Sequence, residues 1–73
     1  MSDTLDLKGL KCPLPALFAR RTLLRAAPGT IVEVLADDPM APIDVPHMCH
    51  NEGYEVLEIV RESSVTRLRL RKP

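Results

Sequence analysis

The residue of this chain best suited to chemistry is Cys12, which lies in the run Lys11-Cys12-Pro13-Leu14-Pro15. The thiolate is the reactive form of cysteine, and a helix N-terminus lowers the thiol pKa by directing free N–H groups and the positive end of the helix dipole at the sulfur. Pro13 and Pro15 suit the first turn of a helix, where N–H groups lack partners anyway. The pattern therefore predicts a nucleophilic Cys12 at a helix start.

The order of charges along the chain adds to this prediction. Ten basic and ten acidic residues cancel overall, but the segment from residue 8 to residue 25 contains no acid. Its charged residues are Lys8, Lys11, Arg20, Arg21 and Arg25. From residue 33 to residue 62 the balance reverses, and Arg61 is the single base. We expect Cys12 to lie in basic surroundings, which favour the thiolate and partners with acidic surfaces.

Two other interpretations of Cys12 are weaker. A free cysteine is often a small buried hydrophobic residue, but flanking charges and prolines argue against that role here. Cysteine hydrolases need a general base, usually histidine. The two histidines are His47 and His50, and no sequence rule places either near Cys12. Persulfide exchange needs less catalytic machinery than hydrolysis, because one thiolate attacks a sulfur that is carried by another thiol.

The segment His47-Met48-Cys49-His50 could suggest a metal site with Cys12 as a further ligand. On a helix only residues three or four apart share a face, so His47 and His50 could face one way while Cys49 points elsewhere. We therefore predict no metal site and assign Cys49 to the core. A resolving disulfide between Cys12 and Cys49 stays as an alternative.

The size of the chain limits what surrounds these residues. A chain of 73 residues predicts one small domain spanning residues 1–73, which leaves no room for a deep cofactor cavity, and we expect no cofactor. No apolar run approaches the roughly 20 residues that span a bilayer. The first ten residues lack a signal-peptide profile, which predicts a cytoplasmic, reducing location. One Tyr, one Phe and no Trp argue against a base-stacking surface.

Hydrophobic periodicity and turn residues predict a strand, a helix, a strand, a helix and two strands. The resulting β-α-β-α-β-β order fits an α/β two-layer sandwich, in which two helices cover one face of a four-stranded mixed sheet. Pro28-Gly29 and Gly53 are expected to end the helices. The expected strands are 4–8, 30–37, 54–62 and 65–71, and the expected helices are 12–27 and 43–51.

Two surfaces could contact partners. The first helix carries one apolar stripe suited to packing on the sheet (Ala16, Ala19, Leu23 and Ala26) and a second on another side (Leu14, Leu17 and Leu24). A small core could use both stripes. If the second stripe is instead exposed beside Cys12, it would form a docking surface. In the last strand, Arg67, Arg69 and Arg71 alternate with leucines, which favours the solvated face of an edge strand over a phosphate-binding surface.

Several motifs together resemble the TusA/SirA-like (YedF/YeeD-type) CPxP sulfur-carrier family, and the similarity extends over nearly the whole chain. The signature Cys12-Pro13-Leu14-Pro15 follows a short strand, and the Asp-Asp-Pro turn lies at a matching distance. The matching segments are Leu5-Asp6, residues 9–15, Arg20-Arg21-Thr22, Pro28-Gly29, residues 36–39, Asp44-Val45-Pro46 and Arg71-Lys72.

The resemblance implies a sulfur carrier and a sulfurtransferase only in that sense, without independent turnover. Cys12 would accept sulfane sulfur as a persulfide from a cysteine desulfurase or rhodanese-like donor. A downstream protein in tRNA thiolation, molybdenum-cofactor maturation or sulfur oxidation would take it. The carrier is expected to be a monomer without direct nucleic-acid contacts. Pro13 and Pro15 would support the motif, and the expected partner contacts are Lys11, Leu17, Arg20, Arg21 and Asp38.

A rival hypothesis from another class also follows from the sequence. In it the chain is a regulatory or interaction module that acts through its helix surface or its arginines, with RNA as one conceivable partner, and Cys12 is structural. This rival predicts an unreactive Cys12 with a normal or raised pKa.

Overall fold

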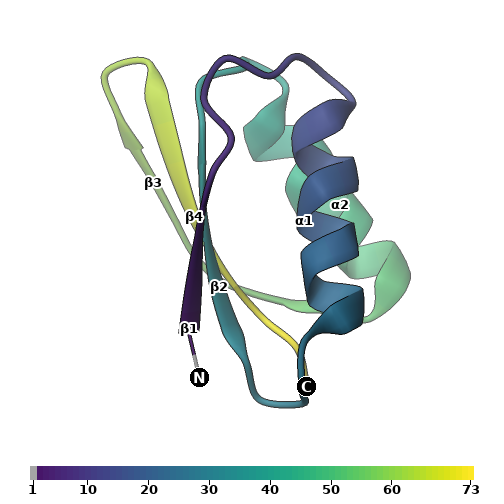
Figure 1. Cartoon of the computed structure of the whole chain (residues 1–73). Coiled ribbons are helices and arrows are strands. Elements are labelled where there is room, and N and C mark those ends of the chain that lie inside the picture. The colour runs from purple at the N-terminus through teal and green to yellow at the C-terminus, as the bar shows by residue number, and fades with distance from the viewer. Residues whose placement is uncertain (1) are drawn as a thin grey trace.

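The structure is a computed structural model that describes residues 2–73. Its elements follow the predicted β-α-β-α-β-β order (Figure 1). Within these residues no helix is both long enough and apolar enough to cross a membrane. The elements are β1 (Ser2–Asp6), α1 (Leu14–Arg25), β2 (Ile31–Ala36), α2 (Ala41–Glu52), β3 (Glu55–Glu62) and β4 (Val65–Arg71).

The four strands form one mixed sheet in the order β1-β2-β4-β3. Strands β1 and β2 are parallel, because α1 provides the crossover that a parallel pair requires. Strand β4 is antiparallel to both of its neighbours, β2 and β3. Both helices lie on the same face of the sheet (Figure 1), so the predicted two-layer α/β sandwich is confirmed.

The core lies between that face and the helices. Alternate residues of β2 and β4 point into it, as the period of two predicts. Each helix contributes a stripe of residues three or four apart, which packs against them. The fully buried residues of these four elements include Ala19, Leu23, Val32, Val34, Ala36, Val45, Cys49, Leu68 and Leu70.

The arginines of β4 lie on the opposite face of the sheet, but not on an edge strand. Because β4 is paired on both sides, the expected edge position is wrong. Glutamates of the neighbouring strands lie beside these arginines: Arg69 is opposite Glu33 and Glu58, Arg71 Nε is 2.6 Å from Glu55 Oε1, and Arg67 Nη2 is 3.5 Å from Glu62 Oε1. Cross-strand charge pairing therefore accounts for the alternation.

Several element boundaries differ from the prediction by a few residues. Strand β1 ends at Asp6 because its carboxylate accepts a hydrogen bond from the Lys8 N–H (3.1 Å), which starts a turn. Helix α1 begins at Leu14 after the N-cap residue Pro13, not at Cys12, and it ends at Arg25. Helix α2 is longer than expected and ends, as predicted, at Gly53, whose φ of +82° is left-handed.

Candidate functional site

Cys12 lies in the β1–α1 loop, two residues before α1, with its side chain exposed to solvent. A turn closed by the Leu14 N–H and the Lys11 carbonyl (2.8 Å) leads from Cys12 into the helix. The same loop is bound to the β2–α2 connection, because the Gly9 N–H donates to Asp37 Oδ1 at 2.9 Å. The two loops thus meet at one edge of the sheet, which brings Cys12 beside the first turns of α2.

The nearest polar partner of Cys12 comes from α2. The Cys12 Sγ–H donates a hydrogen bond to Asp44 Oδ2 over 2.6 Å, although the two residues are 32 positions apart. This hydrogen bond is the main cause of a raised Cys12 pKa, with smaller contributions from desolvation and from the negative charges of Asp44 and Asp38.

The expected lowering of the Cys12 pKa is therefore wrong. It relied on charges close in sequence, but the fold brings acids from a distant segment to the sulfur. Of the expected local cations, Lys8 lies 3.8 Å from Asp6 in an ion pair. The hydrogen bond to Asp44 therefore favours the thiol form of Cys12 and raises its pKa.

A cleft of about 400 Å³ opens between α1 and α2 beside Cys12. Apolar atoms dominate its surface, and polar groups come mostly from α2. The α1 side consists of Cys12, Pro13, Ala16 and Leu17, and the α2 side consists of Asp44, His47, Met48, Asn51 and Glu52. The cleft is wide enough for a short peptide segment or a small thiol compound to reach the sulfur.

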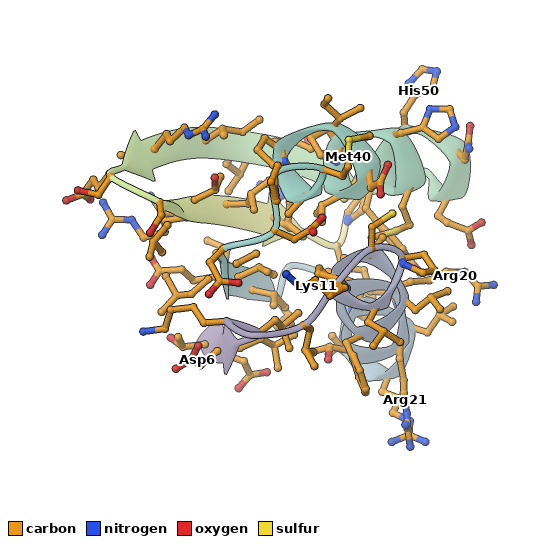
Figure 2. The ribbon with its side chains drawn as sticks, turned by 90° about the horizontal axis from the view of Figure 1, so that it is seen from above. Asp6, Lys11, Arg20, Arg21, Met40 and His50 are labelled. Carbon is orange, nitrogen blue, oxygen red and sulfur yellow. The ribbon has the colours of Figure 1, made fainter. Side chains whose placement is uncertain are left out.

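Side-chain contacts fix the far end of this cleft. His47 Nε2 lies 3.1 Å from Asn51 Nδ2 within α2, and Arg20 Nε lies 3.2 Å from Glu52 Oε1 between the two helices. His47 therefore shares the cleft with Cys12, which the sequence did not predict. His50 points outward from α2, on the side away from α1 (Figure 2).

The predicted partner contacts divide into two groups. Lys11, Leu17, Arg20 and Arg21 are all exposed on or next to α1, and Figure 2 shows Arg21 projecting from the outer side of that helix. Asp38 is half-buried, and its carboxylate accepts a hydrogen bond from the Met40 N–H at 3.0 Å. Asp38 is thus a turn residue that contributes its charge to Cys12.

The second apolar stripe of α1 is exposed, so the core does not use both stripes. Leu17 is 53% exposed and Leu24 is 50% exposed, whereas Ala19 and Leu23 on the opposite side are fully buried. Phe18, which the sequence argument did not single out, is also exposed on this surface. We call Leu14, Leu17, Phe18 and Leu24 the α1 apolar surface.

Both cysteines are unpaired thiols, and Cys49 is buried in the core, as predicted. Among residues 2–73 no three side chains of His, Cys, Asp or Glu gather closely enough to bind a metal ion. The residue in contact with Cys12 that was not predicted from the sequence is Asp44. Its place in the Asp44-Val45-Pro46 match was the available signal.

Comparison with known proteins decides the family. The profile of the family described as sulfurtransferase TusA matches residues 3–72. The chain belongs to the TusA family. Two "putative sulfur carrier proteins" of Neisseria meningitidis, from serogroups A and B, are each 41% identical over 64 residues, covering 88% of this chain and 86% of the relative.

A further relative and a solved structure agree with this assignment. A "putative sulfur carrier protein" of Thermotoga maritima is 41% identical over 59 residues, covering 81% of this chain and 75% of the relative. The crystal structure of a SirA-like protein from Desulfitobacterium hafniense superposes with a TM-score of 0.82 at 25% identity, covering 94% of this chain and 95% of the other. The TusA/SirA-like resemblance inferred from the sequence is confirmed.

Proposed function

We propose that this TusA-family protein carries sulfane sulfur as a persulfide on Cys12 and passes it to an acceptor protein. The observation that carries the proposal is the exposed Cys12 thiol, which opens onto the cleft between α1 and α2 and adjoins the α1 apolar surface. The other cysteine, Cys49, is fully buried and has no access to a partner. Cys12 is therefore the thiol that a donor can reach.

Loading exchanges one sulfur and consumes no oxidant. The Cys12 thiol loses its proton, and the thiolate attacks the outer sulfur of a donor persulfide, R–S–SH. A new S–S bond forms at Cys12, the donor S–S bond breaks, and the donor leaves as a thiol after taking up a proton. Delivery repeats the exchange, with an acceptor thiolate attacking the outer sulfur on Cys12. The chain acts as a carrier and needs no cofactor.

The surroundings of Cys12 suit short-lived contacts with two partners in turn. A cysteine desulfurase or rhodanese-like donor and an acceptor would use the same surface, because each must reach one sulfur. The α1 apolar surface supplies a hydrophobic contact, and Lys11 and Arg21 add exposed positive charge beside it. Pro13 and Pro15 restrict the turn that presents Cys12. We expect a monomeric carrier in the cytoplasm.

The direct test is incubation with a cysteine desulfurase, cysteine and pyridoxal phosphate, followed by intact mass measurement. The wild-type protein should gain about 32 Da for each sulfur that it accepts. Cys49→Ser, a matched loss of one thiol, should gain the same mass. Cys12→Ser should gain none, and an equal gain in that variant would refute the proposal.

One observation favours the rival of an interaction module with a structural cysteine. The pKa of Cys12 is raised, which is what that rival predicts and which slows attack by the free protein. Exposure argues the other way, since structural cysteines are usually buried, as Cys49 is. Two results together would decide for the rival. The wild-type protein would never accept sulfur, and the Cys12→Ser variant would bind the same partner with unchanged affinity.

A further inference from the structure

We propose that Asp44 is a positioning residue that holds the unloaded Cys12 as a thiol and favours release of sulfur from the loaded protein. The first half concerns the thiol alone. The second half rests on the proposed persulfide function. Both halves follow from the same contact between the β1–α1 loop and α2.

The contact is specific in its geometry. Asp44 lies in the first turn of α2, half-buried at the wall of the cleft, with its Oδ2 2.6 Å from the Cys12 Sγ. At that distance the carboxylate binds the thiol proton in a charge-assisted hydrogen bond. The carboxylate thereby favours the protonated thiol and orients the Cys12 Sγ toward α2.

The other charged groups near Cys12 do not offset this effect. From the β2–α2 connection, Asp38 adds a second negative charge. From α1 and the far end of α2, Arg20 and Glu52 pair with each other at 3.2 Å. Exposed Lys11 lies next to Cys12 in the chain, and His47 lines the cleft beside Asn51. The carboxylate in direct contact with the sulfur is therefore the largest cause of the raised Cys12 pKa.

Loading with sulfur removes this hydrogen bond. In Cys12–SH the Sγ carries a proton that Asp44 binds, but in Cys12–S–SH the Sγ is bonded to carbon and to the outer sulfur and has no proton. The exchange Cys12–SH + RSSH → Cys12–S–SH + RSH thus removes the Sγ–H donor that Asp44 binds and places the remaining proton on the outer sulfur, one bond further from Sγ. Any negative charge on the outer sulfur then lies near the Asp44 carboxylate. Both effects favour the unloaded thiol and delivery of the sulfur.

The first test measures the Cys12 thiol without any sulfur donor. The rate of iodoacetamide alkylation at Cys12 is followed against pH in wild-type protein and in Asp44→Asn. We expect the midpoint of the profile to fall in the variant, because the amide carries no charge to bind the thiol proton. For each unit that the pKa falls, the thiolate population at pH 7 rises about tenfold.

A matched control separates this effect from the change in net charge. Glu58→Gln also converts a carboxylate to an amide, but on the sheet face opposite the helices, where Glu58 lies opposite Arg69 in the register of β3 and β4. Its alkylation midpoint should equal that of the wild type. If Asp44→Asn disturbs the helix, Asp44→Ser serves as the second variant. Once its folding is checked by circular dichroism, its alkylation midpoint should also fall below that of the wild type. An unchanged or higher midpoint in a folded Asp44 variant would overturn the first half.

The second test measures how the transferable sulfur is distributed between Cys12 and glutathione at equilibrium. Each protein is mixed with glutathione persulfide and glutathione in a fixed ratio, and the loaded fraction is read from intact mass. We expect Asp44→Asn to retain severalfold more sulfur than the wild type or Glu58→Gln. Equal retention would overturn the second half. If the wild type accepts no sulfur on Cys12, that half fails with the proposed function, while alkylation still decides the first.

Discussion

Cys12 and Cys49 both have a raised pKa, for different physical reasons. At Cys12 the main cause is a hydrogen bond to Asp44 on an exposed site. At Cys49 the cause is burial, which raises the pKa to about 11. Because the contact at Cys12 lies at the surface, we expect a docking partner to displace the carboxylate from the thiol. Only unfolding can return Cys49 to water.

This difference shows that the direction of a pKa shift does not by itself tell whether a cysteine is functional. The relevant property is whether the cause can be removed while the protein stays folded. At Cys12 the shift comes from one surface contact, so a raised pKa is compatible with a sulfur carrier that reacts only when a partner is bound. At Cys49 the shift belongs to the core.

The largest difference should be in alkylation of the folded protein. Iodoacetamide at pH 8 should modify Cys12 much faster than Cys49, because only the Cys12 side chain is exposed. Cys49 should react at least about a thousandfold more slowly than in denaturant, since it becomes accessible only when the structure opens. Peptide mass spectrometry over time measures both rates. Similar rates for the two cysteines in folded protein would contradict the claim that only Cys12 is accessible.

Replacement of each cysteine by serine should separate stability from reactivity. Cys49→Ser places a hydroxyl in a fully buried site and should lower the free energy of unfolding by about 1–3 kcal/mol. Cys12→Ser changes an exposed residue and should stay within about 0.5 kcal/mol of the wild type. Urea denaturation measures both values. A larger loss at Cys12 would point to a structural cysteine there.

Alkaline pH should destabilise the protein mainly through Cys49. An unfolded cysteine loses its proton near pH 8.5, whereas folded Cys49 keeps it until a pH of about 11. Over that range the folded state binds more protons, so stability falls as pH rises, by at most about 1.4 kcal/mol per unit. Thermal unfolding from pH 7 to pH 10 measures the slope. Cys49→Ala should flatten the slope of stability against pH. An unchanged slope would mean that another titrating group causes it.

A smaller effect is expected on docking. Leu17→Glu places a charge in the α1 apolar surface and should slow loading by a cysteine desulfurase about tenfold, typical for one central contact. Leu57→Glu makes the same change at a similarly exposed leucine on the edge strand β3. That control should load within about twofold of the wild type. Equal effects of both substitutions would mean that docking does not use α1.

The fold could be predicted from the sequence because its signals are local. The alternation of Leu68 and Leu70 with arginines and the left-handed stop at Gly53 depend on neighbouring residues, and the structure bears out both. The central position of β4 was missed, since charged residues in an alternating strand fit an edge equally well. Only the pairing of β4 with β2 and β3 explains its glutamate partners.

The candidate site could be predicted only in part. The CPxP motif identified Cys12, and residue spacing identified the second stripe on α1, because both lie in one continuous segment. The effect of Asp44 depends on a contact across 32 residues that the Gly9–Asp37 hydrogen bond helps to set. Charge order along the chain therefore gave the wrong sign for the Cys12 pKa.

The central claim is that Cys12, and not Cys49, carries the sulfur. After loading by a cysteine desulfurase and trypsin cleavage, the two cysteines fall in separate peptides, residues 12–20 and residues 26–61. The account predicts an additional mass of about 32 Da on the first peptide and none on the second. Sulfur on the peptide that contains Cys49, or on neither peptide, would contradict it.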